Sequence, residues 1–270
     1  MDAAALPIAP SRQPLSGRCI AVTRPEGQAE SLCRAIRAAG GEALPFPVLA
    51  IGPAPDAAPL LALLPQLDAF DLAFFVSPNA VHHALELVLS RRAWPAGLRV
   101  ATVGQGSVRA LVQRGFSQVI APQQGFDSES VLALPEFAAA AVHGRRVLIL
   151  RGDGGRDLLA DTLHARGARV ECVCCYRRFR PEIDPERLLA PARAGRLDAL
   201  LLTSTEGVSN LVLMVGAQGL ALLRTVPVFV SHPRIASRAC EAGFTCVVNT
   251  PAGDEGLLQA LCCHFAQTQP

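Results

Sequence analysis

The sequence predicts an α/β fold with parallel sheets, because short apolar runs alternate with amphipathic stretches along most of the chain. Half of the 270 residues are hydrophobic, so the chain can bury a sizeable core. A third observation is an internal repeat at a spacing of 127–128 residues, which indicates two similar α/β halves. The repeat aligns 18–27 with 146–155, 76–81 with 203–208, and 115–116 with 243–244.

Each strand is predicted from a short apolar run, and each helix from apolar residues at helical spacing between two such runs. The predicted strands are 18–23, 42–46, 71–77, 99–103, 118–121, 146–151, 169–175, 198–203, 227–230 and 246–248. The predicted helices are 28–39, one from 79, 105–114, one near 128–141, 156–166, and others between and after the last strands. Helices between successive strands imply parallel strands that are covered on both faces.

Two segments interrupt this pattern. The Pro-dense segment 45–59 is interpreted as a linker. Residues 1–17 are expected to form a loose tail, and the first of them lack the charged start and apolar centre of a signal peptide. No membrane span is predicted, and the nine Cys are expected to be reduced thiols in a cytoplasmic protein.

The composition excludes several classes of function. All 25 basic residues are Arg, so a lysine Schiff base, a pyridoxal phosphate anchor and a Walker-type phosphate loop are impossible. The formal net charge of +2 provides no basic field for nucleic acid. Any anionic ligand must therefore be bound by Arg, hydroxyls and backbone N–H groups.

Five loops link a predicted strand to a helix through small, hydroxyl-bearing or glycine residues: 76–79, 103–107, 151–156, 203–206 and 230–234. Free N–H groups at a helix start bind carboxylate or phosphate. For any single loop, ordinary N-capping by Ser, Thr or Asn is the simpler explanation. Five loops facing one cleft between two α/β domains would favour anion binding.

Two rival sites fit the sequence poorly. The segments 104–106 and 152–154 each read Gly-X-Gly but lack the third glycine of a dinucleotide-binding fingerprint. Cys172 and Cys175 have CxxC spacing, but no second pair completes a tetrahedral metal site. We interpret the thiols of this cluster as part of the core, and no metal is expected.

Tyr176 is the only tyrosine of the chain, and it lies between an apolar strand and two arginines. Its position allows two interpretations. The ring could form a wall with its hydroxyl in water, or the hydroxyl could donate a proton at a domain boundary. Taken alone, the residue favours the first interpretation, in which the ring forms a wall.

The loops, taken in order, resemble those of the uroporphyrinogen-III synthase family. The matching motifs are Val-Thr-Arg-Pro at 22–25, Phe-Val-Ser-Pro-Asn-Ala-Val at 75–81, Val-Gly with a following Ser at 103–107, Arg-Gly with Gly-Arg at 151–156, the segment 173–178, Leu-Thr-Ser-Thr-Glu-Gly at 202–207 and Ser-His-Pro-Arg-Ile-Ala at 231–236. Each motif is short, and the identification rests on their order and spacing across nearly all of 18–250.

The resemblance implies two similar parallel-sheet α/β domains joined by two crossover segments, with the ligand cleft between them. One domain would combine 18–47 with 178–264 and the other would be 53–172, with crossovers near 47–53 and 172–178. The repeat alone would suggest tandem halves. Members of the family are typically monomers without cofactors, and this chain is expected to be the same.

The resemblance also implies a substrate and a reaction. The family closes the linear tetrapyrrole hydroxymethylbilane while inverting its terminal ring D, and hydroxymethylbilane synthase could hand the substrate over. Tyr176 matches the family's Tyr and is the candidate acid for the leaving hydroxyl. The candidate substrate-binding residues are Thr23, Arg24, Ser77, Asn79, Gly104, Ser107, Arg151, Gly152, Arg156, Ser204, His232 and Arg234.

Two positions depart from the family's pattern. Asn79 stands where some members carry Arg, and His232–Ile235 replaces a Gly-Pro-Thr-Thr-like turn. The alternative function is a non-catalytic two-domain protein that binds or senses a small polyanion. Turnover of hydroxymethylbilane to the type III isomer would distinguish the enzyme from the binder.

Overall fold

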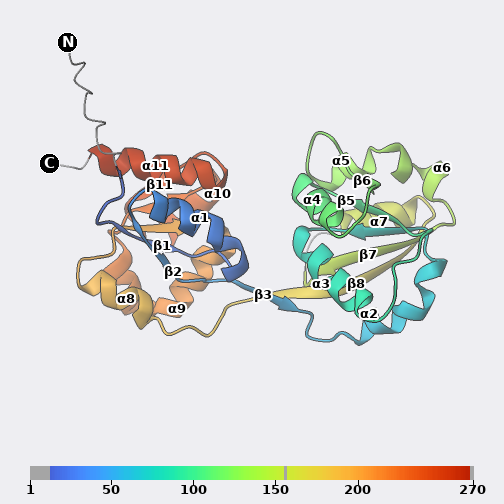
Figure 1. Cartoon of the computed structure of the whole chain (residues 1–270), viewed down its shortest axis with the longest axis horizontal. Coiled ribbons are helices and arrows are strands. Elements are labelled where there is room, and N and C mark those ends of the chain that lie inside the picture. The colour runs from blue at the N-terminus through green and yellow to red at the C-terminus, as the bar shows by residue number, and fades with distance from the viewer. Residues whose placement is uncertain (1–12, 155–156, 268–270) are drawn as a thin grey trace, which may run out of the picture. The chain divides into compact units, whose positions relative to one another are not determined.

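The computed structural model describes residues 13–154 and 157–267, which Figure 1 colours from the N-terminal end to the C-terminal end. The chain forms two compact units. Unit 1 combines the residues up to Ala50 with those from Phe179 onward, and unit 2 is Ile51–Arg178. The chain therefore leaves unit 1 once and returns to it once.

Unit 1 contains a parallel sheet in the order β11-β10-β9-β1-β2. Its elements are β1 (Cys19–Val22), α1 (Glu26–Ala38), β2 (Glu42–Pro45), α8 (Glu186–Arg193), β9 (Ala199–Leu202), α9 (Thr205–Leu223), β10 (Val228–Val230), α10 (Pro233–Glu241), β11 (Val247–Asn249) and α11 (Gly253–Gln267). Because alternate strand residues point to opposite faces, each face buries its own set of apolar side chains. One set packs with α1 and α11, and the other with α8, α9 and α10.

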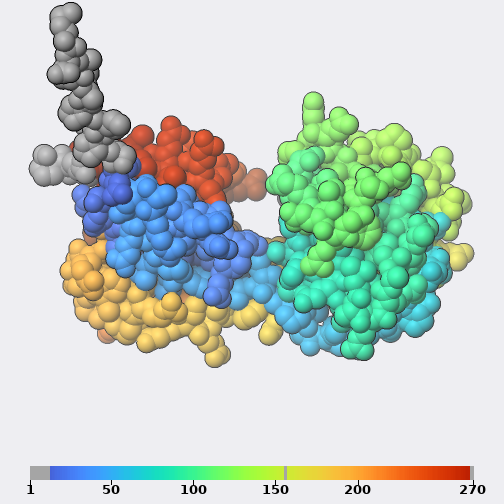
Figure 2. Space-filling model, in the orientation of Figure 1, coloured from blue at the N-terminus to red at the C-terminus, as the bar shows by residue number. Residues whose placement is uncertain are grey.

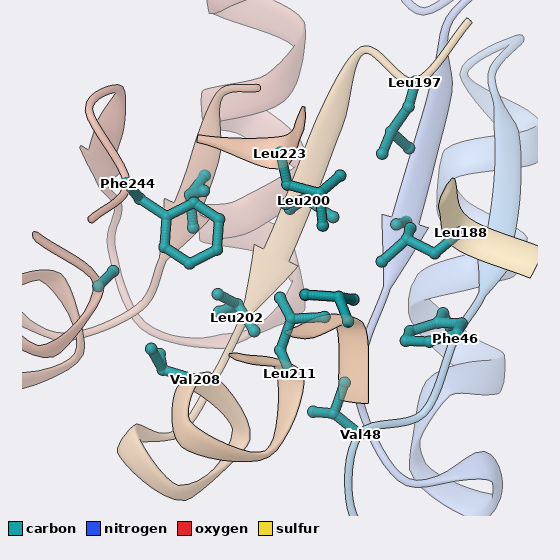
Figure 3. Close-up of a cluster of buried hydrophobic side chains, with 14 of the residues drawn as sticks. Phe46, Val48, Leu188, Leu197, Leu200, Leu202, Val208, Leu211, Leu223 and Phe244 are labelled. Carbon is teal, nitrogen blue, oxygen red and sulfur yellow. The ribbon is translucent and has the colours of Figure 1, made fainter. Parts of the chain in front are cut away.

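Figure 3 shows the second of these clusters, where Leu200 and Leu202 of β9 meet Val208 and Leu211 of α9. Phe46, which follows β2, fills the same layer and is fully buried. These contacts fix α9 on the sheet, and with it the loop between β9 and α9.

Within the described residues, α9 is the one helix that is long and apolar enough to cross a membrane by length and composition. Its mean hydropathy is 1.4 over the tested window, and a third of that window is buried. Gly216 lies inside α9 with φ 64°, so the helix is broken there into two pieces. The buried face of α9 belongs to the core of unit 1.

Unit 2 contains a second sheet, in the order β3-β8-β7-β4-β5-β6. Its elements are β3 (Ala50–Pro53), α2 (Ala58–Leu63), a 3₁₀ helix (Leu64–Ala69), β4 (Leu72–Phe75), α3 (Pro78–Leu89), β5 (Arg99–Thr102), α4 (Gln105–Gln113), β6 (Val119–Ile120), α5 (Ser128–Leu132), a 3₁₀ helix (Pro135–Phe137), α6 (Ala139–Val142), β7 (Arg146–Gly152), α7 (Leu158–Ala165) and β8 (Arg169–Phe179). One face packs against α2, α3 and α4, and the other against α5, α6 and α7. Figure 2 shows one face of the two units in space-filling form, in the colours of Figure 1.

The internal repeat corresponds to strands at equivalent places in the two sheets. The repeat aligns β1 with β7, the turn after β4 with the turn after β9, and the turn before β6 with the turn before β11. The order β2-β1-β9-β10-β11 of unit 1 then matches the order β8-β7-β4-β5-β6 of unit 2. The two units therefore have the same strand arrangement, but their equivalent strands occur in a different order along the chain.

Several sequence-based boundaries were wrong. The supposed linker 45–59 contains β3 and the start of α2, because proline is tolerated on an edge strand and β3 is the edge of its sheet. The single helix near 128–141 is instead three short helices, because Pro135 cannot continue a helix from the residues before it. The expected loose tail 1–17 includes Leu15, which is fully buried in unit 1, whereas 1–12 lie outside the described residues.

Candidate functional site

Each sheet has one place where successive connections run in opposite directions, and ligands of open α/β sheets bind beyond the carboxyl ends of the strands at such a place. In unit 2 it lies between β4 and β7, and in unit 1 between β1 and β9. Most of the candidate residues lie at the ends of these four strands or shortly after them.

In unit 2 this place is hollowed. A cavity of about 330 Å³ lies over the ends of β4 and β7. Its wall is apolar at Phe74 and Ile149, while Arg151, Arg178 and Tyr176 contribute polar groups. A concave, largely apolar site with a few polar groups is the usual form of a small-molecule site.

Tyr176 reaches this cavity because β8 is irregular where it passes β7. Arg151 pairs with Cys174, but Gly152 pairs with Tyr176, so Cys175 is an extra residue on β8. In a regular strand Cys175 and Tyr176 would point to opposite faces. The irregularity instead directs both side chains into the cluster that packs against α3.

The Tyr176 hydroxyl is held by the first turn of α3. The backbone N–H of Ala80 donates to Ser77 Oγ at 3.2 Å, and Ser77 Oγ donates to Tyr176 Oη at 3.1 Å. Ser77 therefore caps the helix and contacts the phenol at once. The hydrogen bond between the two hydroxyls therefore places the phenol oxygen beside the N-terminal end of α3, where the helix dipole is positive.

The tyrosine is more enclosed than the sequence suggests. Only 1% of Tyr176 is exposed, so the interpretation as a wall with its hydroxyl in open water is wrong. The ring belongs to the core of unit 2, and it lines the bottom of the cavity.

Arg151 places a guanidinium in the wall of the same cavity as Tyr176. Its Nη1 donates to Asp157 Oδ1 at 2.5 Å, and this hydrogen bond raises the pKa of the guanidinium above its ordinary value. The side chain is 16% exposed, so it is held in place but still reaches the cavity. Arg156, also predicted for this loop, lies outside the described residues.

In unit 1, the candidate residues at the equivalent place bond to their own unit. Thr23 Oγ1 donates to the carbonyl of Leu201 at 2.6 Å, which ties β1 to β9. Arg24 pairs with Asp254 of α11. Ser204 Oγ accepts from the N–H of Gly207 at 2.9 Å and caps α9.

Burial raises the pKa of Asp254, but hydrogen bonds from Ser31 and Arg24 outweigh it and hold the pKa below its ordinary value. The carboxylate is therefore charged at neutral pH. A cavity of about 520 Å³ is lined by Arg24, with Arg37 and Arg187 also in its wall. Neither of these two arginines was predicted, because neither follows a strand.

The remaining candidates lie at helix starts. His232 caps α10, its Nδ1 accepting from the N–H of Arg234 at 3.1 Å, and both side chains are exposed. Gly104 precedes α4 without a side-chain cap, Asn79 is half-buried in the first turn of α3, and Ser107 is 2% exposed. Ordinary N-capping thus accounts for the hydroxyls of Ser77 and Ser204, although Ser77 has a second role.

The cysteine cluster divides between the two faces of β8. Cys175 is buried and its pKa is raised to about 12 by burial, whereas Cys172 is exposed and Cys174 half-buried. The interpretation as core thiols holds for Cys175 and is wrong for Cys172. The reason is strand alternation, which places positions 172 and 174 on the face opposite the α3 cluster.

Within the described part of the chain, one group of side chains has the spacing of metal ligands. The ligand atoms of His82, His83 and Glu86 lie within 4.8 Å of one another on α3. His82 Nδ1 lies 3.1 Å from a guanidinium nitrogen of Arg114. A bound cation would meet that positive charge, so the group is a poor fit for a metal.

Comparison with known proteins gives one consistent result. A family model described as uroporphyrinogen-III synthase HemD matches residues 30–259. The chain is 33% identical over 246 residues to the uroporphyrinogen-III synthase of Salmonella typhimurium, covering 90% of this chain and 99% of that protein. It is 35% identical over 193 residues to the Escherichia coli protein of the same name, covering 71% and 78%.

Solved structures agree at the level of the fold. A mutant uroporphyrinogen III synthase from Thermus thermophilus matches with a TM-score of 0.58 and 20% identity, covering 93% of this chain and all of that one. The Helicobacter pylori uroporphyrinogen-III synthetase matches with a TM-score of 0.52 and 12% identity, covering 93% and 98%.

Proposed function

We propose that this chain, which belongs to the uroporphyrinogen-III synthase family, closes hydroxymethylbilane into uroporphyrinogen III. The observation in this chain that best supports this reaction is the chain of hydrogen bonds from Ala80 through Ser77 to Tyr176. It ends in the only phenol of the chain, which lines an arginine-bearing cavity.

The reaction needs one proton delivered and little else from the protein. The hydroxymethyl C–O bond breaks as the phenol of Tyr176 protonates the departing oxygen, and the pyrrole nitrogen supplies the electron pair. The resulting azafulvene is attacked by the substituted carbon of ring D, which gives a spiro intermediate. Cleavage and re-closure of that intermediate invert ring D, with the loss of one water overall.

Water is lost and the reaction involves no net oxidation or reduction, so the proposed activity is that of a lyase without a redox cofactor. The tyrosinate left after proton transfer regains its proton from water or from the carbon that closes the ring. The protein's second task is to hold a flexible chain folded until the ring closes.

Arginine and backbone N–H groups would hold the substrate's carboxylates. Arg151 keeps a guanidinium at the cavity of unit 2, and the uncapped start of α4 presents N–H groups. In unit 1, Arg37 and Arg187 line the cavity beside Arg24. Among the candidate substrate-binding residues, we assign this role to the arginines and to the backbone at Gly104. The proposal includes a cytoplasmic monomer that receives its unstable substrate from hydroxymethylbilane synthase.

The test is turnover of hydroxymethylbilane, generated in the assay by hydroxymethylbilane synthase. Products are oxidised to porphyrins, and the type III isomer is separated from the type I isomer that forms spontaneously. We expect the type III isomer to dominate with the wild-type chain. Tight binding of hydroxymethylbilane with only the type I isomer formed would instead identify a non-catalytic binder.

A further inference from the structure

The position of the Tyr176 ring depends on a close approach to Gly152. The two residues are paired across β7 and β8 after the irregularity at Cys175. A Cβ at position 152 would lie 2.6 Å from Tyr176 Cζ and 2.9 and 3.0 Å from the two Cε atoms. The ring therefore lies across the backbone of Gly152, where any other residue would displace it.

A second contact comes from α3. The imidazole of His83 stacks on the phenol ring with their planes 16° apart and their centroids 6.1 Å apart. Burial, followed by the neighbouring His82, lowers the pKa of His83, so the stacked ring is neutral at pH 7. Nearby Glu86 acts in the opposite direction without reversing the shift.

These contacts fix two different properties of the phenol. The hydrogen bond to Ser77 fixes the position of the phenol oxygen, but it does not fix the plane of the ring. Gly152 and His83 restrict the ring itself, which sets the direction in which the phenolic proton points. A donor must lie within about 3 Å of the atom it protonates and point at it, so ring orientation matters as much as acidity.

We propose that His83 and Gly152 are positioning residues that hold the Tyr176 ring so that its hydroxyl points at the reacting centre. The catalytic role of these two residues rests on the proposed function. Their contacts with the Tyr176 ring, which we call the clamp, are a property of the free protein. Neither residue needs to touch the substrate.

The single tyrosine makes the clamp observable without turnover. With tyrosine labelled by ¹³C in the ring, the protein shows the ring signals of Tyr176 alone. We expect His83→Ala to shift or broaden these signals, because the stacked imidazole and its ring current are removed. His82→Ala is the matched control, since His82 is the neighbouring exposed residue and its imidazole contacts Arg114 and His83, whereas the ring that contacts the phenol is that of His83.

Kinetics provides the second readout. We expect His83→Ala to lower kcat for hydroxymethylbilane by about 10- to 100-fold with little change in KM, as for a misplaced catalytic group. His83→Phe should restore most of kcat, because it can stack in the same place. His83 also lines a cavity of about 480 Å³, which gives the larger ring room.

The outcomes separate the clamp from the reaction. Unchanged Tyr176 signals in His83→Ala, or equal shifts in His82→Ala, would overturn the clamp whatever the activity. Altered signals with kcat unchanged would overturn the positioning role. If the wild-type chain fails to form the type III isomer, the proposed function is wrong, yet the ring signals still decide whether the clamp exists.

Discussion

Replacing Gly152 by alanine tests the closest contact of the candidate site. The added Cβ would lie 2.6–3.0 Å from three ring atoms of Tyr176, well inside van der Waals contact. The ring cannot move freely, because only 1% of it is exposed and His83 stacks on it. Overpacking of this kind costs about 1–3 kcal/mol of unfolding free energy. We therefore expect Gly152→Ala to destabilise unit 2 by that amount.

The cost should depend on the ring itself. Tyr176→Leu lacks Cζ and both Cε atoms, which are the atoms that the new Cβ meets. In that background Gly152→Ala should cost less than in the wild type by more than about 0.5 kcal/mol, which is the largest difference expected for uncoupled changes. Urea unfolding is followed by the fluorescence of Trp94, the only tryptophan, which packs against Phe75 in unit 2. Equal costs in both backgrounds would refute the close approach.

Four other predictions concern separate groups. Tyr176→Phe should lower kcat by about 10²–10⁴-fold if the phenol is the acid, and a loss of under about threefold, less than one hydrogen bond, would exclude that role. Ser204→Ala should cost about 0.5–2 kcal/mol in unfolding free energy through the lost cap and change turnover about tenfold or less; abolished turnover in a folded variant would contradict this. Cys175, whose pKa burial raises to about 12, should resist iodoacetamide at pH 8 while exposed Cys240 reacts, as peptide mass spectrometry can show. Burial raises the pKa of Asp254, but its hydrogen bonds lower the pKa by more, so the pKa is lower in the folded state than in the unfolded state. The charged carboxylate therefore stabilises the fold above its unfolded pKa, and that stability is lost as the pH falls below about 4. Asp254→Asn should flatten this acid-side loss in urea titrations followed by circular dichroism, and an unchanged pH profile would count against the ion pair.

The elements that could be predicted are those whose signal lies within a few neighbouring residues. The apolar runs at 18–23 and 146–151 predicted β1 and β7, and the repeat that joins them predicted two related sheets. β3 was missed because Pro53 and the prolines around the strand argue against it, and only its place at the sheet edge makes Pro53 tolerable. Edge position depends on the whole sheet, which local sequence does not encode.

The candidate site shows the same division. Tyr176 and Arg151 could be predicted because each lies at the end of an apolar strand. The direction of the tyrosine ring could not, since it depends on the irregularity at Cys175 and on the pairing with Gly152 across β7. His83 carried no signal for the same reason, because it contacts the site through the Tyr176 ring, which strand alternation would have placed on the other face.

The repeat also explains why the proposed chemistry belongs to one unit. The spacing of 128 residues that relates β1 to β7 relates Val48 to Tyr176 and Arg24 to Gly152. Val48 is buried against α9, as Tyr176 is against α3, but it carries no proton to donate. Arg24 has the Cβ that Gly152 lacks, so a ring at position 48 could not lie across it. The two sheets thus offer the same frame, and unit 2 holds both the phenol and the glycine that the phenol requires.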